Sequence, residues 1–371
     1  MAPQDWWPGG WWLVLQCAAL AAMARTAWMA LRAERPLVAG DGDATAPRIS
    51  VVVPARDEAE RIAGCLAPLR GAPGVVEVLV VDDESSDGTA AVARSHGATV
   101  LAGVPLPDGW VGKAWALHQG ASAARGEWVV TLDADTVPDP RLPAALVARL
   151  GREGVRVATA TGRFRCPTGP ARWLHAAMLT TLVVRFGPAG RRGGSRLANG
   201  QCMAMRRDDL VDLLGAVRGS TVEDVALVAT ADRRGWSTRL VDATPLLTVQ
   251  MYDTFGATWR GWGRSLSLAG AVPPPALAWH LVLVAVAQVA PPLALVAALA
   301  ASAPAAHVAL PFALLAVRLG TLAGTRRTYE RGGPWYWASP LADALAWCSL
   351  VAGAARRVLR RPERWRDRTY A

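Results

Sequence analysis

The chain has 371 residues, of which 52% are hydrophobic and 19% are charged, and its formal net charge is +10. This length and composition suit one soluble domain accompanied by a membrane portion. The positive charge comes almost entirely from arginine, much of it beside apolar stretches, which favours a bilayer as the partner surface and argues against nucleic acid. The five cysteines are scattered, without a paired or metal-binding spacing, so we expect reduced thiols.

An apolar stretch near the N-terminus predicts a membrane anchor over residues 1–35. Residues 11–31 are rich in Trp, Leu and Ala, with aromatic residues at one end and Arg32 and Arg35 after the other. A cleaved signal peptide would carry its positive charges before the apolar stretch instead. The positive-inside rule therefore predicts a plasma-membrane protein whose later residues, beginning with a linker at 36–47, are cytoplasmic.

Residues 48–250 are expected to form a soluble α/β domain. Short valine-rich segments alternate with helical patterns, and this alternation predicts a mostly parallel sheet covered by helices. The expected strands are 49–53, 76–81, 99–101, 127–132 and 156–161. The expected helices lie between them, at 57–69, 87–96, 112–124 and 140–150.

The C-terminal region, residues 273–355, is expected to be embedded in the membrane. Apolar stretches near 276–301 and 305–324 are long enough to cross a bilayer. A third, near 335–355, is interrupted by a proline and an aspartate, and it precedes a basic tail (356–371) that the charge rule keeps in the cytoplasm. We therefore expect a multi-pass protein with two C-terminal crossings plus a re-entrant or surface segment.

The segment between the soluble domain and this region, residues 251–272, mixes aromatic residues with arginine. That composition is typical of a helix lying on the membrane surface. Trp259 and Trp262 either cover an acceptor or anchor the segment at the interface. Arg260 and Arg264 either neutralise a diphosphate or contact lipid phosphate. Both pairs of alternatives stay open.

Acidic residues follow two of the expected strands at the points where each strand ends. Asp82 and Asp83 end one strand, and Asp133 and Asp135 flank Ala134 after the other. Because the carboxyl ends of parallel strands meet at a ligand-binding crevice, we expect these side chains to converge. The first pair either caps a helix or binds the uracil and ribose of a nucleotide. The second pair suits Mg²⁺ or Mn²⁺, which would bridge the diphosphate oxygens of a nucleotide donor.

Two further motifs carry candidate chemistry. Lys113 is the only lysine in a chain that uses arginine everywhere else, which favours contact with a phosphate or base over a solvated side chain. Glu223 and Asp224 begin a helical pattern, where they either complement the helix dipole or supply a general base. The floor of the site is expected at three residues upstream, Asn199, Gly200 and Gln201.

Taken in chain order, these motifs resemble those of membrane-bound family 2 glycosyltransferases of the GT-A fold. The matched positions are 53–58, 81–89, Gly112, Lys113, Ala116, Leu117, Asp133, Asp135, Gly200, Arg206, Arg207, Glu223 and Asp224. Within the family the sequence is most similar to hopanoid-associated and diaponeurosporenoate (carotenoid) glycosyltransferases, on residues 106–113, 198–201 and a tail at 365–370. In that tail Asp367 stands where glycine is usual.

The resemblance implies an inverting enzyme that moves one sugar from a UDP-sugar to a membrane lipid of the carotenoid, hopanoid, polyprenyl or glycerolipid type. It implies that Glu223 and Asp224 are catalytic and that Asp133 and Asp135 hold the cation. It assigns donor binding to Pro54, Ala55, Arg56, Glu58, Asp82, Asp83, Lys113, Asp133, Ala134 and Asp135.

Two alternatives remain from the sequence. A polysaccharide synthase of this superfamily would carry Gln-X-X-Arg-Trp after the base, and residues 259–264 depart from that pattern. A non-catalytic nucleotide-binding membrane scaffold is disfavoured because all the expected acids are present. A dinucleotide-binding dehydrogenase is disfavoured as well, because no G-x-G-x-x-G follows the first strand.

Overall fold

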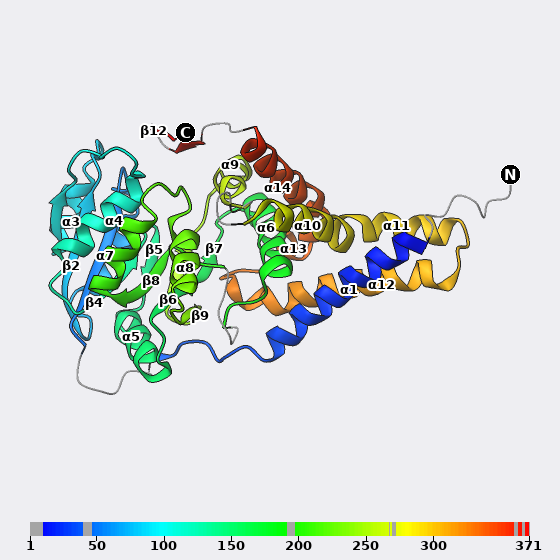
Figure 1. Cartoon of the computed structure of the whole chain (residues 1–371), viewed down its shortest axis with the longest axis horizontal. Coiled ribbons are helices and arrows are strands. Elements are labelled where there is room, and N and C mark those ends of the chain that lie inside the picture. Colours follow the sequence, from blue (N-terminus) through cyan, green and yellow to red (C-terminus); the bar gives the residue numbers. More distant parts are fainter. Residues whose placement is uncertain are drawn as a thin grey trace. The chain divides into compact units, whose positions relative to one another are not determined.

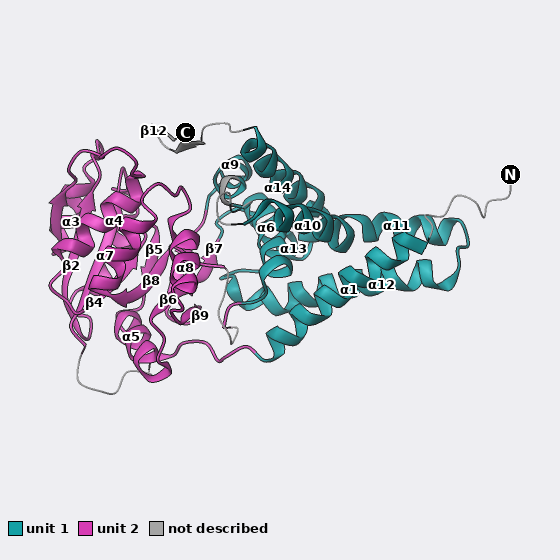
Figure 2. Ribbon diagram, viewed as in Figure 1, with its two compact units in different colours: residues 1–32, 166–188, 252–361 teal, residues 33–165, 189–251, 362–371 magenta. Residues whose placement is uncertain are grey.

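The computed structural model describes residues 10–39, 47–190, 197–266, 268, 272–359, 363–365 and 368–370, with its elements labelled in Figure 1. The chain forms two compact units, coloured separately in Figure 2. Unit 1 comprises residues 1–32, 166–188 and 252–361. Unit 2 comprises residues 33–165, 189–251 and 362–371. Much of the predicted linker, at 40–46, and Asp367 of the tail lie outside the described residues.

Unit 2 is built on a seven-stranded sheet. Its strands are β1 (Ile49–Ala55), β2 (Val75–Asp82), β3 (Thr99–Ala102), β4 (Trp128–Leu132), β6 (Val157–Thr161), β8 (Cys202–Arg206) and β9 (Thr238–Asp242). They follow the order β3-β2-β1-β4-β8-β6-β9, and every neighbouring pair is parallel except the two that involve β8. The five predicted strands are all present, which confirms a mostly parallel α/β sheet.

Helices of unit 2 alternate with these strands. They are α2 (Ile62–Leu66), the 3-10 helix η3 (Ala67–Leu69), α3 (Thr89–Ser95), α4 (Gly112–Ala123), α5 (Leu142–Glu153), α7 (Arg207–Ala216) and α8 (Glu223–Arg233). Helix α4 packs on β1 and β2. A Cβ atom at Gly120 would lie 2.4 Å from Val52 Cγ1, so this helix reaches the sheet only with glycine at that position. This close packing fixes the start of α4, where Lys113 lies.

Two small sheets complete the strands. Strands β5 (Thr136–Pro138), β7 (Arg163–Arg165) and β10 (Leu247–Gln250) form one sheet, with β10 in the middle. Strands β11 (Glu363–Trp365) and β12 (Arg368–Tyr370) form an antiparallel pair. The start of the predicted linker is also ordered against unit 2: Leu37 is fully buried and its N–H donates to Asp242 O at 2.7 Å.

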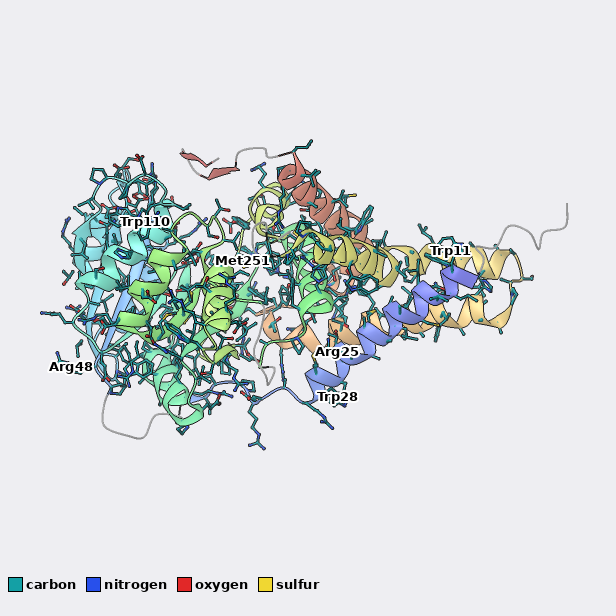
Figure 3. All side chains as sticks on the ribbon, viewed as in Figure 1. Trp11, Arg25, Trp28, Arg48, Trp110 and Met251 are labelled. Carbon is teal, nitrogen blue, oxygen red and sulfur yellow. The ribbon has the colours of Figure 1, made fainter. Side chains whose placement is uncertain are left out.

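Unit 1 is helical. Its elements are α1 (Gly10–Leu31), α6 (Gly169–Phe186), α9 (Phe255–Ser265), α10 (Pro274–Val284), the π-helix η4 (Ala285–Val289), α11 (Ala290–Ala300), α12 (Ala305–Thr325), the 3-10 helix η5 (Arg326–Thr328), α13 (Pro334–Trp337), the 3-10 helix η6 (Ser339–Ala342) and α14 (Asp343–Val358). Among the described residues, three helical segments are long and apolar enough to cross a membrane: Gly10–Leu31, Pro274–Ala300 and Ala305–Thr328. Figure 3 labels Trp11 near the start of α1, with Arg25 and Trp28 nearer its end.

The third C-terminal apolar stretch is broken into α13, η6 and α14, as the proline and aspartate in it suggest. Asp343 is not left as an isolated charge. Its two carboxylate oxygens accept hydrogen bonds from Arg318 Nε and Nη2, both at 2.8 Å, and the two residues are only 2% and 1% exposed. A paired and doubly hydrogen-bonded charge is the form in which an ion pair is tolerated in an apolar interior.

Candidate active site

Two loops that follow β1 and β2 are tied together by hydrogen bonds. Asp83 N donates to Ala55 O at 2.8 Å, Asp57 N donates to Ser85 Oγ at 3.0 Å, and Asp57 Oδ1 accepts from Ser86 N at 2.8 Å. Asp57 and Glu84 adopt left-handed backbone conformations, with φ of 52° and 60°. Non-glycine residues adopt these angles only where their surroundings hold them. The two loops therefore form one rigid rim at the carboxyl ends of β1 and β2.

The predicted donor-binding residues of the first motifs lie on this rim. Pro54 and Ala55 pair in register with Val81 and Asp82. Asp82 Oδ1 accepts from Ser85 N at 3.2 Å, as a capping residue would, but its side chain is only half-buried. Asp83 is buried, and Arg56 Nη1 lies 3.8 Å from its carboxylate. Glu58 N donates to Thr89 Oγ1 at 2.8 Å.

Lys113 contacts both the predicted metal-binding motif (Asp133–Asp135, the metal motif) and the predicted base motif (Glu223 and Asp224). Its ammonium nitrogen lies 2.8 Å from Asp133 Oδ1, 3.0 Å from Asp133 Oδ2 and 3.1 Å from Glu223 Oε1. Burial disfavours the ammonium ion, but the carboxylates of Asp133 and Glu223 raise the pKa of Lys113 well above its ordinary value. Lys113 is therefore permanently charged, in contact with residues that are 20 and 110 positions further along the chain.

The Asp133–Asp135 segment connects β4 to β5, and Asp133 is the member of its two acids that contacts Lys113. Burial, followed by the charges of Asp133 and Glu58, raises the pKa of Asp135 to about 7. Asp135 Oδ1 is buried and has no hydrogen-bond partner in the described part of the chain. An unpartnered carboxylate oxygen beside a second carboxylate fits a divalent cation. Among the described residues no group of three or more His, Cys, Asp or Glu is placed to hold a metal, so further ligands would come from substrate or water.

Glu223 and Asp224 open α8 and face different partners. Glu223 is buried against Lys113. Asp224 Oδ2 accepts from Gly200 N at 2.7 Å and its Oδ1 accepts from Val225 N at 2.8 Å. Burial, followed by the charge of Glu223, raises the pKa of Asp224 to about 6. A carboxylate that is mostly ionised at neutral pH and titrates just below it suits a general base.

The predicted floor of the site connects these acids. Asn199 Nδ2 donates to Gln201 Oε1 at 3.0 Å, and Asp133 N donates to Gln201 O at 3.0 Å. A Cβ atom at Gly200 would lie 3.2 Å from Asp224 Cβ, so glycine allows the backbone to approach the carboxylate closely. Residues 199–201 thus position both Asp133 and Asp224.

Residues 199–201, which are also predicted to lie on the acceptor or phosphate side, belong to unit 2, whereas the other four residues predicted for that side belong to unit 1. Trp259, Arg260 and Trp262 lie on α9, with the Trp262 ring 4.1 Å from the ring of His175. Arg260 is exposed, and the side chain of Arg264 lies outside the described part of the structure. Their roles remain predictions.

The matched segments 53–58 and 81–89 include the polar residues that tie the rim together, but their hydrogen bonds to one another were not predicted; these residues are Asp57, Ser85, Ser86, Asp87 and Thr89. The resemblance assigned a catalytic role to Glu223, and the contact of its carboxylate with Lys113 was not predicted. The dense run of Ser, Asp, Gly and Thr after β2 is a turn signal that could have identified the first group. No local signal identifies the second contact, because it joins distant residues.

Comparison with known protein families matches residues 50–214 to the family described as glycosyl transferase family 2. The chain is also similar to the 4,4'-diaponeurosporenoate glycosyltransferase of Staphylococcus haemolyticus, with 25% identity over 248 residues, which cover 64% of this chain and 66% of the relative. The protein of the same description from Staphylococcus aureus strain MRSA252 is 41% identical over 88 residues, which cover 24% of each chain. The matches thus span just under two thirds of the first relative and about a quarter of the second.

Two solved structures are similar over part of the chain. A mycobacterial protein is 26% identical, with 64% of this chain and 83% of that chain covered and a TM-score of 0.44. Glucosyl-3-phosphoglycerate synthase from Mycobacterium tuberculosis, solved with Mn²⁺, uridine diphosphate and glucosyl-3-phosphoglycerate, is 24% identical. In that comparison 60% of this chain and 78% of the other are covered, with a TM-score of 0.41.

Replacing Lys113 by methionine should destabilise unit 2. The change leaves Asp133 and Glu223 without their shared cation, and breaking a partly buried ion pair of this kind costs about 1–3 kcal/mol. Thermal unfolding of the full chain in detergent, followed by tryptophan fluorescence, measures the loss at neutral pH. The matched control Arg141→Met, which breaks an exposed pair with Asp139, should leave the melting temperature almost unchanged. Equal effects of the two variants would contradict a special role for Lys113.

Replacing Asp135 by asparagine should stabilise the chain in a chelating buffer at about pH 8. The native pKa of about 7 lies above the ordinary value of 3.8, so unfolding releases a proton between these values and stability falls as the pH rises through them. Asparagine removes this dependence. The same variant should lose the rise in melting temperature that Mn²⁺ gives the wild type; a retained Mn²⁺ effect would reject Asp135 as a ligand.

Proposed function

This chain is a family 2 glycosyltransferase related to the carotenoid glycosyltransferases, and we propose that it transfers one sugar from a UDP-sugar to a membrane lipid with inversion. The predicted family and the GT-A class of α/β fold are confirmed by the match over residues 50–214 and by the mostly parallel sheet. The observation that carries the proposed reaction is the contact of Lys113 with both Asp133 and Glu223. It brings the metal motif and the base motif to a single side chain.

The proposed donor lies along the rim formed by the loops after β1 and β2. Asp83 accepts the imide N–H of uracil, with Arg56 beside it, and Asp82 is placed toward the ribose. The rim is already held by backbone and side-chain hydrogen bonds, so little ordering is needed when the nucleotide binds. Lys113 stays charged and supplies a cation for the diphosphate.

A divalent cation, Mg²⁺ or Mn²⁺, fits Asp133 and Asp135, and when bound it would stabilise the negative charge that develops on the departing UDP. The support is the unpartnered Asp135 Oδ1 and the raised pKa of that carboxyl group. The backbone N–H of Asp133 donates to Gln201 O, and its carboxylate accepts from Lys113. The carboxylate is therefore oriented before substrate binds. This pre-organisation is what an ion-binding pair of carboxylates requires.

Asp224 is the proposed base. The acceptor oxygen forms a bond to the anomeric carbon, the bond from that carbon to the β-phosphate oxygen breaks with its electron pair leaving on UDP, and the acceptor proton moves to Asp224. A double displacement would need a second carboxylate as nucleophile. Glu223 does not suit that role, because it is buried and paired with Lys113. A single displacement inverts the configuration at the reacting carbon.

The proposed acceptor is a membrane lipid of the carotenoid, hopanoid, polyprenyl or glycerolipid type. The same chain carries three helices that are long and apolar enough to cross a bilayer, and its curated relatives are named for a carotenoid acid. Because nucleotide sugars are cytosolic, we propose that unit 2 lies on the cytoplasmic side of the plasma membrane. Residues 259–264 do not carry the Gln-X-X-Arg-Trp pattern of the processive synthases, which supports the transfer of one sugar.

The purified full chain should convert a lipid extract and a UDP-sugar, in the presence of Mn²⁺, into a lipid heavier by one hexose or related residue. Mass spectrometry of the lipid phase after incubation with individual UDP-sugars identifies both the donor and the acceptor. Asp135→Asn serves as the inactive control. Products with a ladder of added sugars would favour a polysaccharide synthase instead, and UDP binding without any product would favour a scaffold.

Replacing Asp224 by asparagine should lower kcat/KM by about 10²–10⁴-fold with a hydroxyl acceptor, because the proton acceptor is lost. In the wild type, kcat/KM should rise tenfold per pH unit up to about pH 6 and then level off, since the base must be ionised. The variant should not show this rise of kcat/KM with pH, and its affinity for UDP, measured by calorimetry, should be unchanged.

Asp232→Asn is the matched control, because Asp232 lies on the same helix and accepts from Thr238 Oγ1 away from the other acids. It should leave turnover unchanged. A carboxylate acceptor is already ionised at neutral pH and needs no base. Full activity of Asp224→Asn with a hydroxyl acceptor would rule out the assignment, whereas full activity with a carboxylate acceptor alone would identify the acceptor class.

A further inference from the structure

Arg185, in the last turn of α6 in unit 1, is a buried charge whose hydrogen bonding is incomplete. It is 8% exposed, and its Nη1 donates to Leu266 O at 2.6 Å. Its Nε and Nη2 groups are buried and have no hydrogen-bond partner in the part of the chain that the structure describes. Leaving donors of an ionised group unsatisfied in an apolar interior costs more free energy than almost any other polar defect.

Arg172 shows how the same helix satisfies a buried arginine. It is 9% exposed, and its two terminal nitrogens donate to Gly332 O at 2.9 Å and Cys166 O at 2.8 Å. In two other arginines the nitrogens that lack partners in Arg185, Nε and Nη2, are both hydrogen-bonded. Arg318 donates to the two carboxylate oxygens of Asp343 through its Nε and Nη2, and Arg156 donates to those of Asp209 in the same way. The unpartnered Nε and Nη2 of Arg185 therefore form the pair of parallel donors that fits two oxygens of an oxyanion.

No carboxylate within the described residues forms an ion pair with Arg185. Burial lowers the pKa of its guanidinium to about 9. A second donor group lies nearby: the His280 ring packs edge-on against Phe186 at 5.1 Å, and the Arg185 guanidinium lies 4.8 Å from the same Phe186 ring. His280 Nδ1 is also buried without a hydrogen-bond partner among the described residues.

The surroundings of this pair are apolar. Val184, which precedes Arg185, packs in a buried cluster that draws on α1, α10, η4 and α12 and consists of Ala19, Met23, Val184, Leu283, Val286, Ala287 and Leu314. Leu283 lies one turn beyond His280 on α10. The two unpartnered polar groups thus lie beside an apolar interior, and a ligand that reaches them needs a charged end and an apolar body.

We propose that Arg185 and His280 form a binding site in unit 1 for the oxyanion end of an amphiphile, a carboxylate or phosphate carried on an apolar chain. Arg185 Nε and Nη2 donate to two oxygens of the anion, and His280 donates a third hydrogen bond. The apolar chain lies against the exposed side chains of Trp279 and Val282, which flank His280 on α10. The ligand comes either from the bilayer, as a phospholipid headgroup, or from a carboxylated lipid substrate.

The test uses the purified full chain in neutral detergent micelles, titrated with oleate, with phosphatidylglycerol or with monoolein, and followed by thermal unfolding. Oleate carries the carboxylate, phosphatidylglycerol carries the phosphate, and monoolein carries neither. The wild type should be stabilised by at least one of the two anionic lipids and not by monoolein. Stabilisation by oleate alone supports a carboxylated substrate, and stabilisation by phosphatidylglycerol supports a bilayer lipid.

Arg185→Met should abolish this stabilisation, and without anionic lipid it should unfold at the same or a higher temperature than the wild type, because a buried unpaired charge is removed. Arg185→Lys keeps the charge but loses the pair of parallel donors, and should weaken binding at least about tenfold. Arg25→Gln, which changes an exposed arginine of α1, should respond as the wild type does. The proposal is overturned if neither anionic lipid stabilises the wild type, or if Arg185→Met responds to them equally.

Discussion

The proposed active site in unit 2 depends on the interaction of the Lys113 ammonium group with the carboxylates of Asp133 and Glu223. The three residues come from the start of α4, the end of β4 and the start of α8, so their contact fixes three elements at one point. Asp135 and Asp224 are neighbours of the two paired carboxylates along the chain. Four acids are thus gathered around a single lysine. Burial, followed by the charges of neighbouring acids, raises the pKa values of Asp133, Asp135 and Asp224 although the lysine acts in the opposite direction.

The position of that lysine follows from backbone packing. Helix α4 lies against β1 and β2, and Gly120 removes the side chain that would otherwise meet Val52 and Val81. The close approach places the first turn of α4, with Lys113, level with the carboxyl ends of the central strands. A larger residue at 120 would lift the helix and draw the ammonium away from Asp133. Glycine in the helix is therefore a requirement of the site as well as of the fold.

Much of unit 2 could be predicted because its signals are local. The valine-rich strands β1, β2 and β4 and the acids that follow them lie where the sequence pattern places them. Strands β5, β7 and β10 could not be, since strands of three or four residues carry too little periodicity, and no local signal marks the five-residue β8 as antiparallel. The partners of Glu223 and Asp343 were equally hidden. Lys113 and Arg318 lie 110 and 25 positions away, and only the folded chain brings such charges together.

Each unit contains buried charge of one sign that the described residues do not balance. In unit 2 it is negative, at Asp135 beside Asp133, and in unit 1 it is positive, at Arg185. Two other buried arginines of unit 1 have partners among the described residues: Arg318 pairs with Asp343, and Arg172 donates to two carbonyl oxygens. Since an unbalanced buried charge lowers stability unless something binds it, the sign of each indicates the charge of its ligand: a cation at the carboxylates and an oxyanion at the guanidinium.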